Sequence, residues 1–405
     1  MQTRISEQFL QTPQGVEANH ILRSCVHCGF CTATCPTYQL LGDELDGPRG
    51  RIYLIKQLLE GNKVSAKTQT HLDRCLTCRA CETTCPSGVQ YGRLVDIGRE
   101  LVEQRVQRSL LDSLKRWALR KLFPYPSRVA PLLRIGHLLR PMLPASIGNK
   151  VPVPQVVKPR STVDQPRKML LLEGCVQSVA TPETNGAASR VLEKLGIQLV
   201  SGKGAGCCGA VSHHLSAQQE GLVFMRRNID AWWPHIEAGA EAILITASGC
   251  GTVVKEYGHL LKDDPQYAQK AVRVAELAKD ISEVLRDEPL PSERIKPKQK
   301  QIAFHSSCTL QHGQQLDGVV EGILRKAGFK LTPVADAHLC CGSAGTYSIL
   351  QSELSQQLLS NKLQALETGK PEVIVTANVG CQLHLASQAG RPVKHWIELL
   401  DEALK

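Results

Sequence analysis

Two short cysteine motifs constrain this chain more than any other feature. Residues 25–36 read CVHCGFCTATCP and residues 75–86 read CLTCRACETTCP, so one C-x2-C-x2-C-x3-C-P pattern occurs twice. Three equally spaced cysteines wrap a turn of backbone around one metal centre and leave one corner of it open. A fourth, remote thiolate has to complete each centre.

This spacing is typical of two-cluster bacterial ferredoxins, in which the fourth cysteine of each motif ligates the other cluster. It predicts two [4Fe-4S] clusters with crossed ligands: cluster 1 on Cys25, Cys28, Cys31 and Cys85, and cluster 2 on Cys35, Cys75, Cys78 and Cys81. Zinc is the alternative metal. Structural zinc sites usually pair two separated cysteine knuckles around one ion, which an equally spaced triplet fits less well than it fits a cubic cluster.

The chain holds sixteen cysteines in 405 residues, with 42% hydrophobic and 21% charged residues. An aromatic fraction of 4% argues against stacking platforms for nucleic acid. The start, MQTRISEQFLQTPQG, has no apolar core of a signal peptide, and no apolar run reaches the ~20 residues that span a bilayer. We therefore expect a reducing cytoplasm, where sixteen cysteines indicate metal ligation rather than disulfides.

The other eight cysteines belong to an internal duplication. Cys175 and Cys308 are 133 residues apart, as are the doublets GCCGAVSHH and LCCGSAGTY, and the last cysteines are offset by 131 residues. Candidate ligands for further iron sites are therefore Cys175, Cys207, Cys208 and Cys250 in one half, and Cys308, Cys340, Cys341 and Cys381 in the other. Buried structural thiols and redox dithiol chemistry are the alternatives.

Each half alternates short apolar runs with helical stretches, which predicts a parallel α/β sheet. The runs 169–172, 242–245, 302–304 and 373–375 are the expected strands, and the single cysteines follow them directly. Ligand sites in open α/β sheets form outside the carboxyl ends of the strands, so each half should gather its four cysteines in one crevice.

We expect a multidomain chain, with an α-helical ferredoxin-like N-terminal domain followed by two tandem α/β cysteine-rich repeats. The expected boundaries are a ferredoxin-like domain at 1–98, a basic helical region and Pro-rich linker at 99–168, repeat 1 at 169–285, a linker at 286–300, and repeat 2 at 301–405. The basic region has ten Lys/Arg against three acids between 99 and 140. Its amphipathic helix could rest on a membrane or a partner, or pack on its own domain.

The CCG doublets flanked by distant cysteines resemble the cysteine-rich CCG domain of heterodisulfide reductase-like proteins. Two ferredoxin motifs, a linker and two CCG repeats resemble the iron–sulfur subunits of flavin-linked dehydrogenases. Longer stretches are similar to the glycolate oxidase family of these subunits, namely CVHCGFCTATCPTYQLLGDELDGPRGRIYLIKQLLEG, NIDAWWPHIEAGAEAIL, LCCGSAGTY and HWIELL.

This resemblance implies flavoprotein partner subunits that oxidise glycolate to glyoxylate, and a subunit that relays their electrons to the membrane quinone pool. It implies FAD on the partners only, no substrate site on this chain, and peripheral association with the inner membrane. The sequence has no P-loop, and GKGAGC at 202–207 lacks the third glycine of a dinucleotide fingerprint. Related D-lactate or glycerol-3-phosphate dehydrogenases, a heterodisulfide reductase-like catalytic subunit, and a zinc scaffold are the alternative functions.

One departure from the resemblance concerns the end of each repeat. CCG domains with noncubane clusters usually close with C-x-x-C, but here Val253 follows Cys250 by three residues and His384 follows Cys381 by three. The fifth thiol is missing from both repeats, which leaves four-thiolate sites or docking crevices. His384 is a candidate extra ligand in repeat 2, and His305 lies just before Cys308.

Overall fold

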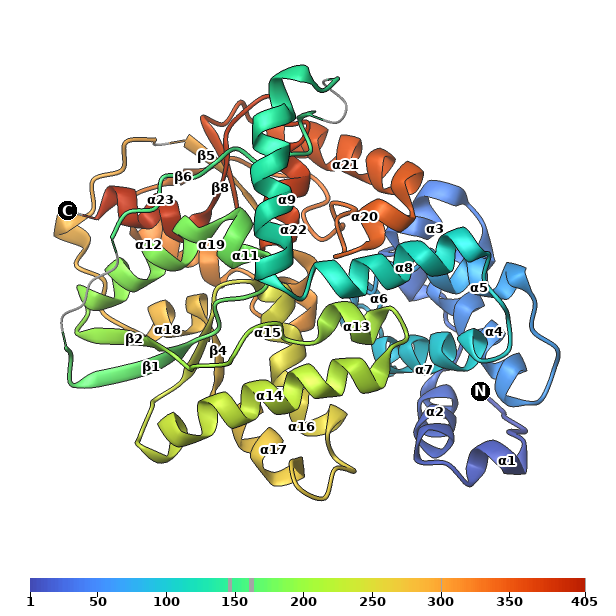
Figure 1. Ribbon diagram of the computed structural model, residues 1–405. Coiled ribbons are helices and arrows are strands. Elements are labelled where there is room, and N and C mark those ends of the chain that lie inside the picture. Colours follow the sequence, from blue (N-terminus) through green and yellow to red (C-terminus); the bar gives the residue numbers. More distant parts are fainter. Residues whose placement is uncertain (145–147, 160–163, 300, 405) are drawn as a thin grey trace. The chain divides into compact units, whose positions relative to one another are not determined.

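The computed structural model describes residues 1–144, 148–159, 164–299 and 301–404 (Figure 1). The chain divides into two compact units. One comprises Met1–Trp117 and His338–Lys362, and the other comprises Ala118–Ala337 and Leu363–Lys405. Within the described ranges, none of the helices combines the length and the apolar character that crossing a membrane requires.

The first unit is built from helices around the two cysteine motifs. They are α1 (Glu7–Leu10), α2 (Pro13–Ser24), α3 (Pro36–Leu41), α4 (Pro48–Leu59), α5 (Ala66–Asp73), α6 (Ala80–Thr83), α7 (Tyr91–Glu103) and α20 (Tyr347–Leu350), with α8 (Leu110–Leu122) and α21 (Ser352–Glu367) continuing past its bounds. Single 3-10 turns occupy Phe30–Thr32 and Glu44–Asp46.

Local sequence signals explain where these helices begin and how closely they pack. Thr12 accepts a hydrogen bond from the Gly15 N–H, and Pro13 occupies the first helical position of α2. Helix α7 packs on α4 at Gly98, where an added Cβ would lie only 2.6 Å from the Ile55 Cγ1 atom. Glycine at this position therefore allows the close approach. Ile55, Leu58 and Leu94 are fully buried between these helices.

The second unit contains two parallel sheets of four strands among the described residues. The first has the order β2-β1-β3-β4 and the second the order β6-β5-β7-β8. The strands are β1 (Arg167–Leu171), β2 (Ile197–Ser201), β3 (Ile243–Ile245), β4 (Ala278–Asp280), β5 (Gln301–His305), β6 (Lys330–Leu331), β7 (Val373–Thr376) and β8 (Val393–His395). Each predicted apolar run falls within one residue of a strand, and the matching orders fit the duplication.

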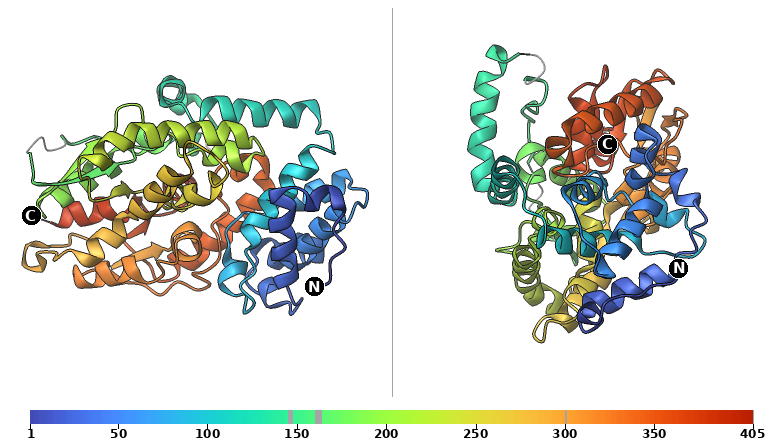
Figure 2. Two further views of the ribbon diagram at one scale, coloured as in Figure 1. Left: turned by 90° about the horizontal axis from the view of Figure 1, so that it is seen from below. Right: turned by 90° about the vertical axis from the view of Figure 1, so that its right-hand side faces the viewer.

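Helices cover these sheets and join their strands. They are α9 (Pro126–Leu139), α11 (Gln177–Ala180), α12 (Pro182–Glu193), α13 (Ala210–His214), α14 (Gln218–Glu237), α15 (Ser248–Lys255), α16 (Tyr257–Leu260), α17 (Ala268–Leu277), α18 (Ile281–Asp287), α19 (Val319–Lys326), α22 (Val379–Ala386) and α23 (Trp396–Ala403). The long α14 runs on the outer side of the first sheet and buries Met225, Ile229 and Trp232 against it (Figure 2). The opposite face shares one core with the second sheet.

The basic helix α8 lies where the sequence predicts a helix, but its apolar face does not pack on its own domain. Leu110 is 89% exposed, and Leu111, Leu114 and Trp117 are also exposed. Two of its basic neighbours are held in place by ion pairs: Arg108 and Arg116 both pair with Asp73, at 2.6 and 3.0 Å. The expectation that this apolar face packs on its own domain is therefore wrong.

The Pro-rich part of the expected linker is described except for 145–147 and 160–163, which lie outside the described residues. Its described part contains a 3-10 turn at Arg140–Met142. Residues 338–362 of repeat 2 group with the first compact unit. This segment therefore belongs to repeat 2 by sequence but to the first compact unit by packing.

Candidate metal centres

The first cavity of the N-terminal unit brings together the cysteines assigned to cluster 1. Cys25, Cys28 and Cys31 line it with Cys85 of the other motif, and Cys81 also reaches its wall. It contains about 430 Å³ of empty space, part of which opens to solvent. The remote fourth thiol therefore lies beside the triplet that precedes it by more than fifty residues.

The second cavity brings together the cysteines assigned to cluster 2. Cys75, Cys78 and Cys81 line it with Cys35 of the first motif, around about 310 Å³ of empty space. Thiolate sulfur is the ligand that iron–sulfur clusters use, so the donor set of both cavities fits a four-cysteine cluster. These eight residues could hold the two clusters.

Both motifs use the same strained backbone. The second and fourth residues after the first cysteine have positive φ in each: His27 at 58° and Gly29 at 85°, Thr77 at 51° and Arg79 at 61°. Left-handed backbone at a residue other than glycine costs about 1 kcal/mol or more and tends to occur at functional sites. One consequence is local: the Thr77 N–H turns inward and donates to the Cys75 Sγ at 3.4 Å.

The thiols lie in surroundings that disfavour negative charge unless a cation is present. Burial raises the pKa of Cys31 to about 11, and the neighbouring Cys25 adds to the shift. Burial also raises the pKa of Cys81 well above its usual value, with contributions from Cys78 and Cys75. A bound iron centre inverts this balance because it stabilises thiolates directly.

A buried ion-pair network lies against the second cavity. Arg51 is 1% exposed and lines the cavity with Cys35 and Cys75. Its Nη1 donates to the Thr37 Oγ1 at 3.1 Å, and Thr37 in turn lies 3.3 Å from the Cys35 Sγ. The fully buried Asp46 balances this charge. The cavity thus has a fixed cation beside its ligands.

The Asp46 carboxylate has three charged or ionisable partners. It lies 3.4 Å from the Arg51 Nη2, 2.8 Å from the Arg74 Nη1 and 3.0 Å from the His71 Nδ1. Tyr91 also lines this cavity, and its buried hydroxyl lies 3.6 Å from the Cys75 Sγ. Cysteine spacing alone did not indicate these residues. The available signal was the cluster of acids and arginines at 43–51, between the two motifs.

Repeat 1 gathers its four cysteines at the carboxyl ends of its strands, as predicted. Hydrogen bonding links neighbouring thiols in the order Cys175, Cys207, Cys208 and Cys250. Hydrogen bonding with Cys207 and burial raise the pKa of Cys175 well above its usual value. Gly209 has φ of 91°, and a Cβ there would lie 2.8 Å from the Gly221 carbonyl oxygen, so the turn after the doublet requires glycine.

Repeat 2 shows corresponding local geometry. Cys340 and Cys341 are buried, and Gly342 after them has φ of 86° and donates its N–H to the Cys340 Sγ at 3.5 Å. Cys308 is also buried after β5. The Asn378 side-chain amide lies 3.6 Å from the Cys381 Sγ at the start of α22.

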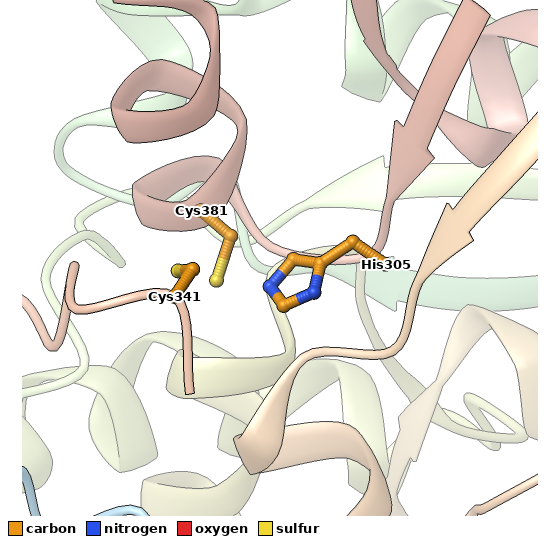
Figure 3. A group of neighbouring side chains, drawn as sticks. All are labelled: His305, Cys341 and Cys381. Carbon is orange, nitrogen blue, oxygen red and sulfur yellow. The ribbon is translucent and has the colours of Figure 1, made fainter. Parts of the chain in front are cut away.

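A histidine points at the last cysteine of repeat 2. His305, the last residue of β5, and Cys381, on α22, have potential ligand atoms within 4.8 Å of each other, and Figure 3 shows the ring directed toward the sulfur. Cys341, also labelled there, belongs to repeat 2 by sequence and to the first compact unit by packing. His384 lies three residues beyond Cys381 on α22 and is half-buried. The 133-residue offset pairs His305 with Leu172, so repeat 1 has no imidazole at this position.

Comparison with known families agrees with this layout. Residues 21–89 match the 4Fe-4S dicluster domain, and residues 169–255 and 302–386 match the cysteine-rich domain. The chain is 59% identical over 406 residues to the glycolate oxidase iron-sulfur subunit of Escherichia coli (strain K12), with 100% of both chains covered. It is 32% identical to the probable glycolate oxidase iron-sulfur subunit of Bacillus subtilis (strain 168), covering 90% of this chain and 88% of that protein.

A shorter relative matches in part. Lactate utilization protein A of Bacillus licheniformis is 29% identical over 247 residues, which cover 58% of this chain and 99% of that protein. Fold, cysteine sites and domain matches define an iron–sulfur protein with a 4Fe-4S dicluster domain and two cysteine-rich domains. Within that class, the chain belongs to the glycolate oxidase iron-sulfur subunit family.

Proposed function

We propose that this chain is the electron-transfer subunit of a glycolate oxidase complex, in which flavoprotein subunits oxidise glycolate to glyoxylate. The observation that carries the proposal is the convergence of eight thiols in two neighbouring cavities, in a chain 59% identical to a glycolate oxidase iron-sulfur subunit. Two adjacent clusters pass single electrons, and this is the chemistry that they supply when bound.

The residues of the chain have distinct tasks in this proposal. Cys25, Cys28, Cys31 and Cys85 hold one cluster, and Cys35, Cys75, Cys78 and Cys81 hold the other. Arg51 provides positive charge beside the second site, where reduction adds negative charge. Tyr91 donates a hydrogen bond to the Cys75 sulfur and lines both cavities.

We assign the flavin and the substrate to partner subunits, because the sequence contains no P-loop. Its one Gly-x-Gly-x-x-Gly match, GAGCCG at 204–209, contains the cysteine doublet of repeat 1 and precedes a helix of only five residues, α13. The complex then needs at least one FAD-binding partner that contacts this chain. Electrons received from it pass toward the quinone pool of the membrane. The cysteines of the two repeats hold further iron sites, and His305 and His384 are the candidate nitrogen ligands in repeat 2.

The test uses the full-length protein purified without oxygen. Two four-iron clusters predict about eight iron and eight sulfide per chain from the N-terminal sites alone, and an EPR signal after dithionite. Mixed with its flavoprotein partners, the protein should then be reduced by glycolate faster than by D-lactate or glycerol 3-phosphate. Zinc without acid-labile sulfide would contradict the proposal, and a preference for D-lactate would favour the kind of function that the name lactate utilization protein A suggests.

We further propose peripheral association with the cytoplasmic face of the inner membrane through α9. This helix exposes Leu132, Ile135, Leu138 and Leu139, and Met142 follows at 82% exposure. The flanking cations are Arg128, Arg134 and Arg140, with no acid between 113 and 163. Apolar side chains beside cations fit the interface of an anionic bilayer, where each cation contributes about 1 kcal/mol.

Vesicle flotation tests this surface. Wild-type protein should float with vesicles containing phosphatidylglycerol, and Leu138→Glu combined with Met142→Glu should reduce the floating fraction several-fold. Val272→Glu, an exposed apolar residue on α17, is the matched control. If the double variant floats like wild type, α9 is not the membrane-binding element.

A further inference from the structure

The doublet of repeat 2 shares a compact unit with the two ferredoxin motifs. Residues 338–362, which contain Cys340, Cys341 and α20, belong to the same compact unit as residues 1–117, whereas the rest of repeat 2 is assigned to the other unit. The segment leaves the doublet through left-handed backbone at Gly342, Ala344 and Gly345 before α20 begins at Tyr347. A tight turn therefore brings Tyr347 back close to the doublet.

Tyr347 carries a buried hydroxyl that makes no hydrogen bond to any described residue. Its side chain is 6% exposed, and the Oη finds no hydrogen-bond partner among the described residues. Buried hydroxyls are nearly always hydrogen-bonded, so an unpaired one calls for an explanation such as an absent cofactor. Phenylalanine would fill the same space without this desolvation cost.

Thiols and charged groups of the first compact unit act electrostatically on that hydroxyl. Burial raises the pKa of Tyr347, and the thiol of Cys75 adds to the increase. Cys340 acts in the same direction, whereas the guanidinium of Arg51 acts against it. Cys75 of the second cavity and Cys340 of the doublet thus both lie within electrostatic range of the hydroxyl.

Tyr91 provides a precedent on the same cysteine. Its hydroxyl lies 3.6 Å from the Cys75 Sγ, so a tyrosine O–H already serves as a donor to this ligand. Repeat 1 has His214 at the position equivalent to Tyr347, as the alignment of GCCGAVSHH with LCCGSAGTY shows. The tyrosine is therefore specific to the repeat whose doublet packs with the ferredoxin motifs.

We infer that Tyr347 is a positioning residue between the second cavity and the doublet Cys340–Cys341, where its O–H donates a hydrogen bond to a sulfur of the cluster on Cys35, Cys75, Cys78 and Cys81 or to one of that cluster's ligand sulfurs. This inference rests on the cluster ligands proposed above. Tyr347 keeps its proton and is not oxidised.

The experiment is Tyr347→Phe in the full-length, anaerobically purified protein, titrated with dithionite and followed by EPR. A hydrogen bond to sulfur stabilises the reduced cluster, so its loss should lower the reduction equilibrium constant of the second cluster up to about tenfold, which is ~59 mV for a one-electron couple. The first cluster should titrate as in wild type. Cys35→Ser, which removes the second cluster, identifies the two signals.

A second readout does not depend on the potential. After exchange into D2O, a deuteron coupled to the second cluster should be visible in pulsed EPR of wild type and missing in Tyr347→Phe, at unchanged iron content. Tyr53→Phe, which removes an exposed hydroxyl from α4, is the matched control and should behave as wild type.

Two outcomes overturn the inference, and they are distinguishable. If wild type shows two clusters but Tyr347→Phe matches it in both potential and deuteron coupling, Tyr347 has no such contact and only this inference fails. If wild type itself holds no cluster on Cys75, the ligand assignment fails and the inference fails with it.

Discussion

Cys35 is the residue that separates crossed from uncrossed ligation. It is the last cysteine of the first motif but lines the second cavity, beside Cys75, Cys78 and Cys81. Cys35→Ser should therefore remove or alter the second cluster and leave the first intact, lowering iron content by up to about four per chain. EPR of the reduced protein checks this, with Cys85→Ser as the reciprocal variant. Selective loss of the cluster on Cys25, Cys28 and Cys31 would contradict the crossing.

Arg51 is the residue whose charge should matter most to the second site. Arg51→Met leaves Asp46 buried with two partners instead of three, and breaking a buried ion pair costs about 3 kcal/mol. It also removes positive charge beside Cys35 and Cys75, so the second cluster should become harder to reduce. Thermal unfolding and an EPR-monitored redox titration of the cluster-loaded protein measure the two effects.

Arg49→Met is the control for this prediction. Arg49 pairs with Glu44 at 2.6 Å, but both side chains are 39% exposed, and surface pairs contribute at most about 1 kcal/mol. Arg51→Lys keeps the charge and should recover most of the potential while losing the hydrogen bonds to Thr37 and the His71 carbonyl oxygen. Equal effects of Arg49→Met and Arg51→Met would show that burial of Arg51 is unimportant.

The cysteines could be grouped from sequence because cluster ligation requires fixed spacing. The residues around them follow no such rule. Arg51 and Asp46 depend on how 43–51 folds against α5, and Tyr347 lies more than 250 residues from Cys75. His305 was noted beside His384, but only the structure places its ring opposite Cys381.

At the scale of elements, α23 depends on a neutral histidine at its start. The Nδ1 of His395 accepts a hydrogen bond from the Ile397 N–H, and its Nε2 donates to the Thr246 carbonyl oxygen at 2.9 Å. Burial lowers the pKa of His395 from 6.5 to about 4. The unfolded chain therefore binds a proton at a higher pH than the folded chain does, and the stability contributed by the neutral ring is present above pH 6.5 and lost as the pH falls toward 4.

This linkage predicts that unfolding free energy falls by about 1.5 kcal/mol between pH 6.5 and 5 on account of His395 alone. Urea unfolding of the second unit, followed by tryptophan fluorescence in the full chain, measures the slope. His395→Asn should be less stable at neutral pH and show a flatter slope, whereas His235→Asn on α14 should keep the wild-type slope. An unchanged slope in His395→Asn would refute the assignment.

Helix α8 illustrates what periodicity determines at this scale. Leucines at helical spacing predicted the helix and its apolar face. They did not predict that Arg108 and Arg116 would be held by Asp73 of α5, which leaves the leucines exposed. The choice of face depends on a partner distant in sequence, which periodicity does not contain.

At the scale of the whole molecule, duplication made the C-terminal half predictable. Because both repeats carry the same order of runs and cysteines, a parallel sheet for one implied the same sheet for the other. The described residues of each repeat form four strands in equivalent order. The grouping of 338–362 with the N-terminal motifs was not predictable. It breaks the equivalence of the repeats, since repeat 1 lies entirely in the second unit.

The proposed relay makes a prediction for the assembled complex. Without this chain, the flavoprotein partners keep their flavin and substrate site. They should therefore reduce an artificial dye with glycolate, but no natural acceptor in the membrane. Delivery of electrons to the respiratory chain should stop, because no cluster then links flavin to quinone.

Oxygen uptake by membranes supplied with glycolate measures delivery, and dye bleaching measures the flavoprotein step. Restoring wild type should recover oxygen uptake, whereas restoring Cys35→Ser should recover assembly but not oxygen uptake, since one of two clusters in series is lost. Glycolate-driven oxygen uptake that persists without the chain would show that electrons reach the membrane by another route.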